Sequence, residues 1–456
     1  MAYDVRSPYD DSLIQTVPES TEAEVRAALD LAESMREQVA AMPAYRRAAI
    51  LLKAAEILEA QTDDIARLIA RESGKPMRFA RGEAARAVET FTFAAEEAKR
   101  IHGETIPMDA AKGGVGKIGY YMRVPVGIVA AVTPFNFPLN LVAHKVAPAI
   151  AAGCPIVLKP APATPLTAFR LADILKQAGA PEGLFSVVNG GMDVGRWLTT
   201  DPRVAMISFT GSPGVGRAIS RDAGLRRTTF ELGGNAAVIL DETYDASAVV
   251  DKLVTAAFAH AGQVCISVQR IYVHNSQYDS FVSAFVERTQ KLVKGDPLEE
   301  RTELGPVIND AAAQRIEAWV NEAVAAGANL LTGGTRDGRM MDAVVLTDVK
   351  RDMKVMAEEV FGPVVCILPF GDFDEVLKEA DDSAFGLQAG VFTRDLGRAM
   401  RAAQRLNVGG VIINDTPAFR VDHMPYGGNK DSGVGREGPR FAMDDMLTLR
   451  MVVINP

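Results

Sequence analysis

The chain has 456 residues, which is long for a single hydrophobic core, so we expect two or more domains. Its net charge of −9 argues against nucleic acid as a partner, because binding to phosphate groups requires a basic surface. The hydrophobic fraction of 48% is typical of a soluble globular protein, and no apolar run approaches the length of a membrane span.

The N-terminus and the cysteines indicate the compartment. The first residues, MAYDVRSPYDDSL, lack the basic and apolar regions of a secretion signal, which predicts a cytoplasmic location. Cys154, Cys265 and Cys366 cannot all pair with one another, and none lies in a CxxC spacing. We therefore expect neither a disulfide framework nor a zinc or other metal site. One of the three cysteines can still be a reactive thiol.

The first hundred residues are predicted to be helical. Alanine, glutamate, arginine and leucine recur at helical spacing over residues 22–61, and a similar texture runs over residues 78–100. Thr21, followed by Glu22 and Glu24, is a candidate N-cap with an acidic first turn. A half-exposed strand is expected over residues 115–122.

Short apolar runs then alternate with helices up to about residue 240. The expected strands are Gly127–Val132, Pro155–Leu158, Phe185–Val188, Ala205–Phe209 and Ala236–Leu240. The expected helices between them are Ala143–Ala152, Leu166–Ala178 and Gly214–Ala223. This alternation predicts a parallel, doubly wound sheet.

A second α/β series runs from about residue 246 to 410. Its expected strands are Arg270–His274, Val344–Thr347, Val364–Pro369 and Val411–Asn414. The last apolar residues, Leu449–Ile454, are predicted to form a strand that leaves the globule. We therefore expect two α/β units of unequal size.

Four segments carry candidate chemistry. In Ile207–Gly216 a strand, a Gly/Ser turn and a helix start follow one another, and backbone N–H groups with the helix dipole favour a pyrophosphate there. The spacing differs from the GxGxxG of the common dinucleotide fold, so a plain strand–helix turn is the alternative. The other three segments place Asn136 between aromatics and prolines, Glu231 before a glycine pair, and Cys265 among small and apolar residues. Taken singly, these three are as easily a rigid turn, a loop residue and an inert buried thiol.

Taken together and in this order, the four segments resemble the aldehyde dehydrogenase superfamily, from about Glu24 to the C-terminus. The interval of 34 residues between Glu231 and Cys265 is the usual spacing of the general base and the nucleophile in that family. Further family segments are Lys159-Pro160 and those over residues 358–363, 385–387 and 425–433.

The resemblance implies a catalytic set of Cys265, Glu231 and Asn136. Cys265 is expected to attack the aldehyde carbon, because the carbon must become tetrahedral before hydride leaves. The side-chain amide of Asn136 and the N–H of Cys265 are expected to bind the oxyanion, and Glu231 to activate the water that hydrolyses the thioester. Lys145 and Glu437 lie where the family places a proton relay, but we favour a structural salt bridge for both.

The resemblance also implies NAD as the cofactor, with NADP admissible. It assigns Lys159 to the adenosine ribose, Gly211 and Ser212 to the pyrophosphate, and Glu359 to the nicotinamide ribose. NAD-preferring members carry a glutamate three residues after the lysine, where this chain has Pro162; its absence removes repulsion toward a 2′-phosphate. The full expected cofactor set is Thr133, Pro134, Phe135, Lys159, Pro162, Phe209, Gly211, Ser212, Val215, Leu232, Glu359 and Phe361.

Aligned on the motifs, six positions are expected to line the aldehyde tunnel: Arg86, Asn140, His144, Val264, Ile266 and Arg420. Two arginines and a histidine suit a compact anion, because guanidinium binds phosphate or carboxylate oxygens in a fork. The alternative is that Arg86 belongs to a solvated helix face and that Arg420 pairs with Asp422.

The segment over residues 419–425 is similar to the branch acting on lactaldehyde, glyceraldehyde phosphates and phosphono- or sulfo-aldehydes. We therefore expect oxidation of a small anionic or hydroxylated aldehyde to its acid. The alternatives are semialdehydes or simple aliphatic aldehydes, an acylating enzyme using coenzyme A, and an inactive dinucleotide-binding structural protein. Glu231 argues for hydrolysis, since a thiol acceptor needs no water-activating base.

By resemblance, residues 1–105 and 124–233 form a Rossmann-like cofactor domain and residues 234–434 an α/β catalytic domain. Residues 106–123 and 435–456 form a small β element for bridging and oligomerisation. The tail is expected to pair with a neighbouring subunit, giving a homodimer or homotetramer, because an apolar strand with a free edge favours a partner.

Overall fold

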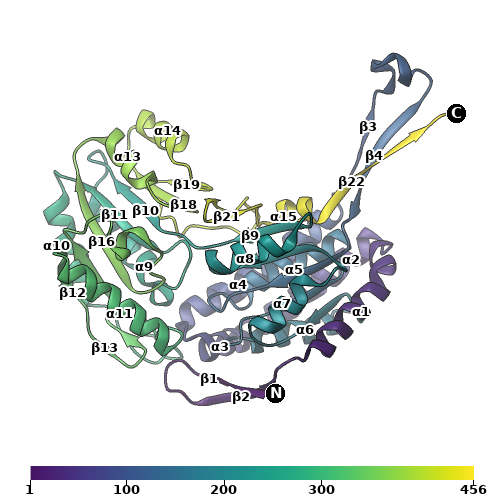
Figure 1. Cartoon of the computed structure of the whole chain (residues 1–456). Coiled ribbons are helices and arrows are strands. Elements are labelled where there is room, and N and C mark those ends of the chain that lie inside the picture. Colours follow the sequence, from purple (N-terminus) through teal and green to yellow (C-terminus); the bar gives the residue numbers. More distant parts are fainter. Residues whose placement is uncertain (1) are drawn as a thin grey trace.

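Two open sheets with flanking helices, and a three-stranded arm that projects from one side, make up the structure, a computed structural model that describes residues 2–456 (Figure 1). The predicted α/β class with two units is confirmed. No helix in the described part of the chain is both long and apolar enough to cross a membrane.

The N-terminal region begins with a hairpin rather than a helix. Strands β1 (Ala2–Arg6) and β2 (Leu13–Pro18) pair antiparallel, so the prediction of helices throughout the first hundred residues was wrong there. Val5 and Val17 are the only fully buried hydrophobic residues in the strands of this hairpin, which is too weak an alternation to stand out in the sequence. Helices α1 (Glu22–Ala40), α2 (Ala44–Ala60), α3 (Thr62–Ser73) and α4 (Met77–Ala98) follow. The predicted N-cap is confirmed, because the Thr21 side chain and Glu24 form a reciprocal capping box.

The first sheet has the strand order β21-β9-β8-β5-β6-β7. Its parallel strands are β5 (Ile128–Val132), β6 (Ile156–Lys159), β7 (Phe185–Val187), β8 (Val204–Thr210) and β9 (Arg227–Glu231), and β21 (Gly433–Val434) joins antiparallel. Its helices are α5 (Asn140–Ala152), α6 (Leu166–Gln177), α7 (Met192–Thr200) and α8 (Pro213–Ala223). The sequence did not predict β9 or α7, whose short segments are rich in polar residues. The chain order reverses between β5 and β8, which marks the edge where open α/β sheets bind ligands.

The second sheet has the order β12-β15-β16-β11-β10-β18-β19 and is parallel apart from its edge strand β12. Its strands are β10 (Ala236–Leu240), β11 (Val268–His274), β12 (Asn329–Thr332), β15 (Val344–Thr347), β16 (Val364–Phe370), β18 (Gln388–Phe392) and β19 (Gly410–Ile413). The main helices around it are α9 (Val250–Phe258), α10 (Tyr278–Gln290), α11 (Asp310–Ala325), α13 (Phe373–Asp381) and α14 (Leu396–Arg405). Shorter elements are β13 (Arg336–Asp337), β14 (Met340–Met341), α12 (Lys354–Ala357), β17 (Phe385–Gly386) and β20 (Asn429–Lys430).

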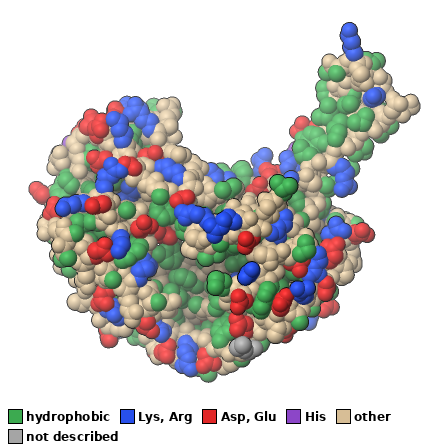
Figure 2. All heavy atoms as spheres, viewed as in Figure 1, with side chains coloured by type: hydrophobic (Ala, Val, Ile, Leu, Met, Phe, Trp, Pro, Cys, Tyr) green, Lys and Arg blue, Asp and Glu red, His purple; other side chains and the backbone are tan. Residues whose placement is uncertain are grey.

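The arm consists of β3 (Glu104–Ile106), β4 (Ile118–Pro125) and the C-terminal β22 (Leu447–Ile454), all antiparallel. Hydrophobic side chains gather on it (Figure 2), and Ile118, Leu449, Met451 and Val453 are exposed. We call the first sheet with its helices the first body, and the second sheet with its helices the second body. Helix α15 (Pro439–Met446), which precedes β22, packs on α4 and α5 of the first body. That the tail pairs with a neighbouring subunit stays a prediction.

A buried ion pair joins the start of α4 to α5. The Lys75 ammonium contacts the Glu83 carboxylate, and both side chains are almost fully buried. The second oxygen of Glu83 accepts the N–H groups of Leu139 and Asn140, at 2.9 and 3.2 Å, where α5 begins. The ammonium also lies 3.7 Å from the centre of the Phe137 ring. The carboxylate thus satisfies a buried cation and the free N–H groups of a helix end together.

Replacing Glu83 with alanine is expected to destabilise the protein by about 3–5 kcal/mol, because it leaves a buried ammonium unpaired. Midpoints of urea-induced unfolding measure the effect. Glu56→Ala is the matched control: it breaks the exposed pair with Lys53 and should cost less than about 1 kcal/mol. Equal shifts for the two variants would show that the Lys75–Glu83 pair does not hold α4 and α5 together.

Candidate active site

Ten of the twelve residues predicted to bind the cofactor lie at or just after the carboxyl ends of parallel strands of the first sheet. Thr133, Pro134 and Phe135 follow β5. Lys159 is the last residue of β6, and Pro162 follows that strand. Phe209, Gly211, Ser212 and Val215 run from the end of β8 into α8, and Leu232 follows β9. Because β5 and β8 flank the point where the chain order reverses, these residues surround the expected ligand crevice of the sheet. Ser212 is the residue before α8, whose N-terminus favours a phosphate group.

Lys159 is buried and faces carbonyl oxygens rather than a carboxylate. Its ammonium donates to the carbonyl of Pro160 at 2.8 Å and to that of Gly190 at 3.1 Å. Burial lowers the pKa of Lys159 to about 8. Pro162, three residues further on, is exposed. It carries no carboxylate that would repel the 2′-phosphate of NADP. Buried hydroxyls of Thr133 and Thr210 have no hydrogen-bond partner within residues 2–456, as expected of groups kept for a ligand. These residues fit a nicotinamide dinucleotide.

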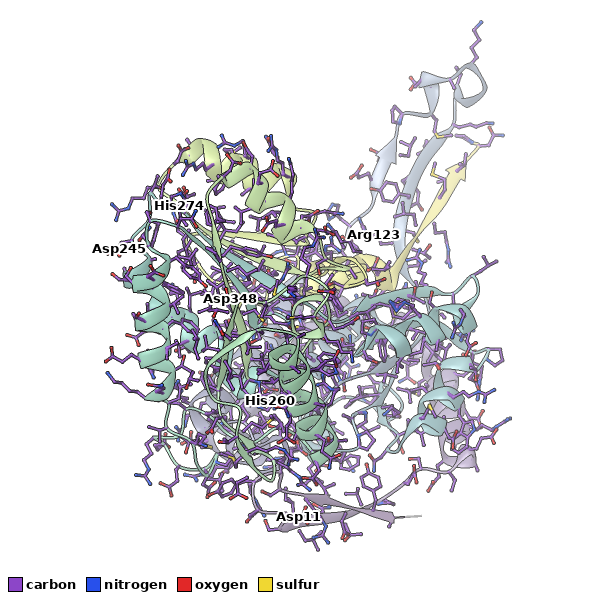
Figure 3. The ribbon with its side chains drawn as sticks, turned by 60° about the vertical axis from the view of Figure 1, so that its left-hand side comes forward. Asp11, Arg123, Asp245, His260, His274 and Asp348 are labelled. Carbon is purple, nitrogen blue, oxygen red and sulfur yellow. The ribbon has the colours of Figure 1, made fainter. Side chains whose placement is uncertain are left out.

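The turn before Cys265 has an unusual backbone. His260, Ala261 and Gly262 take φ values of 50°, 54° and 70° in succession, between α9 and β11. A Cβ at Gly262 would lie 2.1 Å from the carbonyl oxygen of Gly362, so only glycine fits. His260 is labelled in Figure 3, and only 1% of its surface is exposed. Left-handed residues of this kind are costly and are held by their surroundings.

Asn136 reaches this turn from the end of β5. Its side-chain nitrogen donates to the carbonyl of Gln263 at 2.9 Å, which orients the amide. Gln263 is itself held, because its amide nitrogen donates to the carbonyl of His260 and its amide oxygen accepts from the N–H of Ile308. The second N–H of Asn136 remains for an oxyanion. Sequence reasoning did not identify Gln263.

Cys265 is half-buried three residues before β11. Its sulfur lies 3.0 Å from the hydroxyl of Tyr426. Burial raises the pKa of the Cys265 thiol to about 12; the hydrogen bond to Tyr426 lowers it, whereas Glu359 and Glu231 raise it further. Val264, Ile266, Leu387 and Met424 form the apolar surroundings of the sulfur. The sequence placed Tyr426 in a family segment without giving it a role.

Glu231 is the last residue of β9, and not a loop residue. Its carboxylate is buried, and neither oxygen has a hydrogen-bond partner among residues 2–456. Burial, and then the neighbouring Glu437, raise the pKa of Glu231 well above its usual value, against the influence of Arg420 and Lys145. Such a carboxylate suits a base that works near neutral pH.

Gly234 joins the two bodies at the site. A Cβ there would lie 2.1 Å from the carbonyl oxygen of Cys265, and its N–H donates to the Glu359 carboxylate at 2.9 Å. Burial raises the pKa of Glu359 to about 7. Phe361, with a φ of 47°, packs its ring 5.8 Å from that of Phe135. The carboxyl end of β9 therefore lies beside the amino ends of β10, β11 and β16.

Glu437, a charged neighbour of Glu231, forms ion pairs with two cations. Its carboxylate lies 3.3 Å from the Lys145 ammonium and 3.0 Å from the Arg420 guanidinium, with all three side chains at most 5% exposed. Burial alone would raise the pKa of Glu437, but Lys145 and Arg420 lower it to about 2. The salt bridge predicted for Lys145 and Glu437 is therefore present. The guanidinium also stacks on the Tyr426 ring at 3.7 Å.

The alternative that Arg420 pairs with Asp422 does not hold, because Asp422 has other hydrogen-bond partners. The fully buried Asp422 carboxylate accepts two hydrogen bonds from Arg86, at 2.7 and 3.0 Å, and one from Asn140 at 3.0 Å. The Nε2 atom of His144 lies 2.8 Å from the same carboxylate and 2.8 Å from Arg420. Residues 420 and 422 lie in an irregular segment between β19 and β20, and their side chains contact different partners.

Four of the six predicted substrate residues thus form one network. Arg86, Asn140, His144 and Arg420 come from α4, α5 and the segment before Tyr426. Burial and the Arg420 charge lower the pKa of His144, so its imidazole is neutral at physiological pH. Arg86 is not part of a solvated helix face, because it binds Asp422 with only 27% of its side chain exposed. The other two, Val264 and Ile266, lie beside the Cys265 sulfur.

A thiol, an unpaired carboxylate and an amide donor therefore meet between the two bodies. This set can form a covalent adduct with a carbonyl compound, stabilise its oxyanion and activate water. No group of three or more His, Cys, Asp or Glu side chains within residues 2–456 can hold a metal ion.

Comparison with known proteins identifies the family. The family model described as "Aldehyde dehydrogenase family" matches residues 1–452. The chain is 48% identical over 412 residues to 3-sulfolactaldehyde dehydrogenase from Priestia megaterium, covering 90% of this chain and 86% of that protein.

Two solved structures superpose closely on this one. Aldehyde dehydrogenase 21 from Physcomitrella patens, in complex with the reaction product succinate, has a TM-score of 0.97 and 45% identity, covering 100% of this chain and 95% of that chain. Glyceraldehyde-3-phosphate dehydrogenase from Methanocaldococcus jannaschii, complexed with NADP, has a TM-score of 0.95 and 38% identity, covering 99% of both chains. The chain belongs to the aldehyde dehydrogenase family and is an NAD(P)-dependent oxidoreductase acting on aldehydes.

Proposed function

We propose that the protein oxidises a short aldehyde with an anionic group at its far end, through a thioester on Cys265. The observation that carries this proposal is the position of Arg420. Its side chain is 5% exposed and stacks on Tyr426, whose hydroxyl contacts the Cys265 sulfur. The Nε atom of this guanidinium is buried and has no hydrogen-bond partner in the described chain. An anionic oxygen close to the reacting thiol would satisfy it.

The charges around the site favour an anion. Three cations, Arg86, Lys145 and Arg420, face two carboxylates of low pKa, Asp422 and Glu437. The two carboxylates balance two of these cations, so among these five side chains one positive charge is left over in a region where water screens little. That charge attracts a sulfonate, phosphate or carboxylate more than it attracts an uncharged chain end.

The named relatives support the same class of substrate. Sulfolactaldehyde carries a sulfonate, glyceraldehyde 3-phosphate a phosphate, and succinate a second carboxylate. Each is a short molecule whose anionic end lies a few atoms from the reacting carbon. The polar side chains of Asn140 and His144 would also bind a hydroxyl group on the substrate carbon next to the aldehyde. Lactaldehyde is therefore the second candidate.

The residues support four chemical roles. The Cys265 thiolate adds to the aldehyde carbon, and the aldehyde oxygen becomes an oxyanion. This oxyanion accepts hydrogen bonds from the second N–H of the Asn136 amide and from the backbone N–H of Cys265. A bound nicotinamide cofactor would supply the acceptor for the hydride that leaves this carbon. The carbon–sulfur bond then belongs to a thioester, and Glu231 takes a proton from the water that attacks it. The balance is aldehyde, NAD(P)⁺ and water giving the acid, NAD(P)H and a proton. Glu359 and Lys159 would hold the two riboses of that cofactor.

Anionic aldehydes are expected to exceed propanal and benzaldehyde by about tenfold or more in kcat/KM, a difference of about 1.4 kcal/mol. The assay follows NADH or NADPH formation with sulfolactaldehyde, glyceraldehyde 3-phosphate, succinate semialdehyde, lactaldehyde, propanal and benzaldehyde. Cys265→Ala is the blank and should show no turnover. If propanal or benzaldehyde is preferred, the anionic specificity is refuted while the family assignment stands.

Two variants separate the charge of Arg420 from its packing. Arg420→Gln should reduce the ratio of anionic to neutral kcat/KM, whereas Arg420→Lys should retain most of it, because the charge remains. The ratio is the informative quantity, since any general effect of Arg420 on Tyr426 and Cys265 affects both substrates equally. An unchanged ratio in Arg420→Gln would remove Arg420 from substrate recognition.

Two buried neighbours of Glu231 are expected to shift the pH dependence of kcat in opposite directions. Glu231 acts as a carboxylate, so activity is present above its pKa and is lost as the pH falls through it. Glu437→Gln removes a charge that raises the pKa of Glu231, and should move the acidic limb down by about one pH unit. Lys145→Met removes a charge that lowers that pKa, and should move the limb up. Shifts in the same direction would contradict the assignment of Glu231 as the base.

A further inference from the structure

We propose that Tyr426 is a catalytic residue whose hydroxyl donates a hydrogen bond to the Cys265 sulfur and so stabilises the thiolate for attack. This inference rests on the proposed role of Cys265 as the nucleophile. It goes beyond that role, because it assigns the group that makes the thiol ionisable in a buried site.

The geometry places the two groups in direct contact. The oxygen of Tyr426 lies 3.0 Å from the Cys265 sulfur, within range for a hydrogen bond to sulfur. The sulfur is also the only hydrogen-bond partner of this hydroxyl within residues 2–456. With a neutral thiol, either group can be the donor. Once the thiol has lost its proton, only the phenol can donate, so ionisation fixes the direction of the bond.

The packing of the ring alone does not require a hydroxyl. Tyr426 is 2% exposed and packs with Ile266 and Leu387, contacts that a phenylalanine would make equally well. Burying a phenol without a partner costs free energy, so its oxygen is expected to have a use. Within residues 2–456, the hydrogen-bond partner that its position offers is the Cys265 sulfur.

Tyr426 is held in place from two sides. Its N–H donates to the carbonyl of Glu437 at 3.1 Å, and the N–H of Glu437 donates back at 2.6 Å. The Arg420 guanidinium lies 3.7 Å from the ring centre on its face. A cation over a phenol ring withdraws electron density and makes its O–H group a stronger donor. Burial raises the pKa of Tyr426 well above its usual value, so the donor proton is retained.

The electrostatics of Cys265 make this donor important. Burial raises its pKa to about 12, and Glu359 and Glu231 oppose ionisation as well. Tyr426 and Arg420 act in the other direction, and the hydrogen bond from Tyr426 is the larger of these two influences. Thiolates are the nucleophilic form, so a donor that stabilises the thiolate increases the reactive fraction.

This role acts on the sulfur and not on the far end of the substrate. Its loss should therefore reduce activity toward anionic and neutral aldehydes by the same factor. That separates Tyr426 from Arg420, whose charge is proposed to recognise the anionic group.

The test compares Tyr426→Phe with the wild type by the rate of Cys265 alkylation with iodoacetamide across the pH range. Phenylalanine keeps the ring, its stack on Arg420 and its apolar contacts. The rate at pH 8 should fall about tenfold, as for a rise of about one unit in the pKa of Cys265. Cys154 and Cys366 are fully buried, so they should not react, and Cys265→Ala gives the background rate.

Tyr278→Phe is the matched control. It removes a hydroxyl that bonds the carbonyl of Ile367 at 3.4 Å, far from the site in the second body. Its alkylation profile should equal that of the wild type, and thermal unfolding checks that both variants fold. A wild-type profile for Tyr426→Phe would overturn the inference. If Cys265→Ala itself retained turnover, the proposed function would fail instead.

Discussion

A buried carboxylate between two buried cations is the interaction on which the rest of the site depends. Glu437 contacts both Lys145 and Arg420, and its own backbone pairs with Tyr426. Charges taken out of water are tolerated only when they are paired, so these contacts fix the positions of several side chains together. Lys145 comes from the first body, whereas Arg420 and Tyr426 belong to the long segment that leaves the second. The pairing therefore aligns the two bodies at the point where Cys265 and Glu231 meet.

The same burial disfavours the charged form of both reacting groups. Removal from water raises the pKa of the Cys265 thiol and of the Glu231 carboxyl, so each needs a neighbour to favour its charged form. Tyr426 supplies a donor to the sulfur, and Lys145 and Arg420 supply positive charge near the carboxylate. A resting thiol that is not ionised is also protected from oxidation and from unwanted electrophiles. Reactivity then depends on the assembled site rather than on the cysteine alone.

The sequence predicted the α/β class, most strands of both sheets, and the family, because these depend on local apolar patterns and on short motifs at fixed spacing. Asp422 shows where such reasoning stops. From sequence, its neighbour Arg420 was one alternative partner, yet the carboxylate binds Arg86 and His144, which lie 336 and 278 residues away. The hydroxyl of Tyr426 was overlooked for the same reason, since its contact with Cys265 spans 161 residues. Which charges and donors meet is decided by tertiary packing, and no periodicity or spacing reports it.

Mass spectrometry of the Glu231→Gln variant tests whether the reaction passes through a thioester on Cys265. Without the carboxylate that activates water, mixing the variant with an anionic aldehyde and NAD(P)⁺ should give one equivalent of NAD(P)H per active site. The acyl group should then be found on the peptide that contains Cys265. Repeated turnover without an adduct, or an acyl group on another residue, would contradict the account.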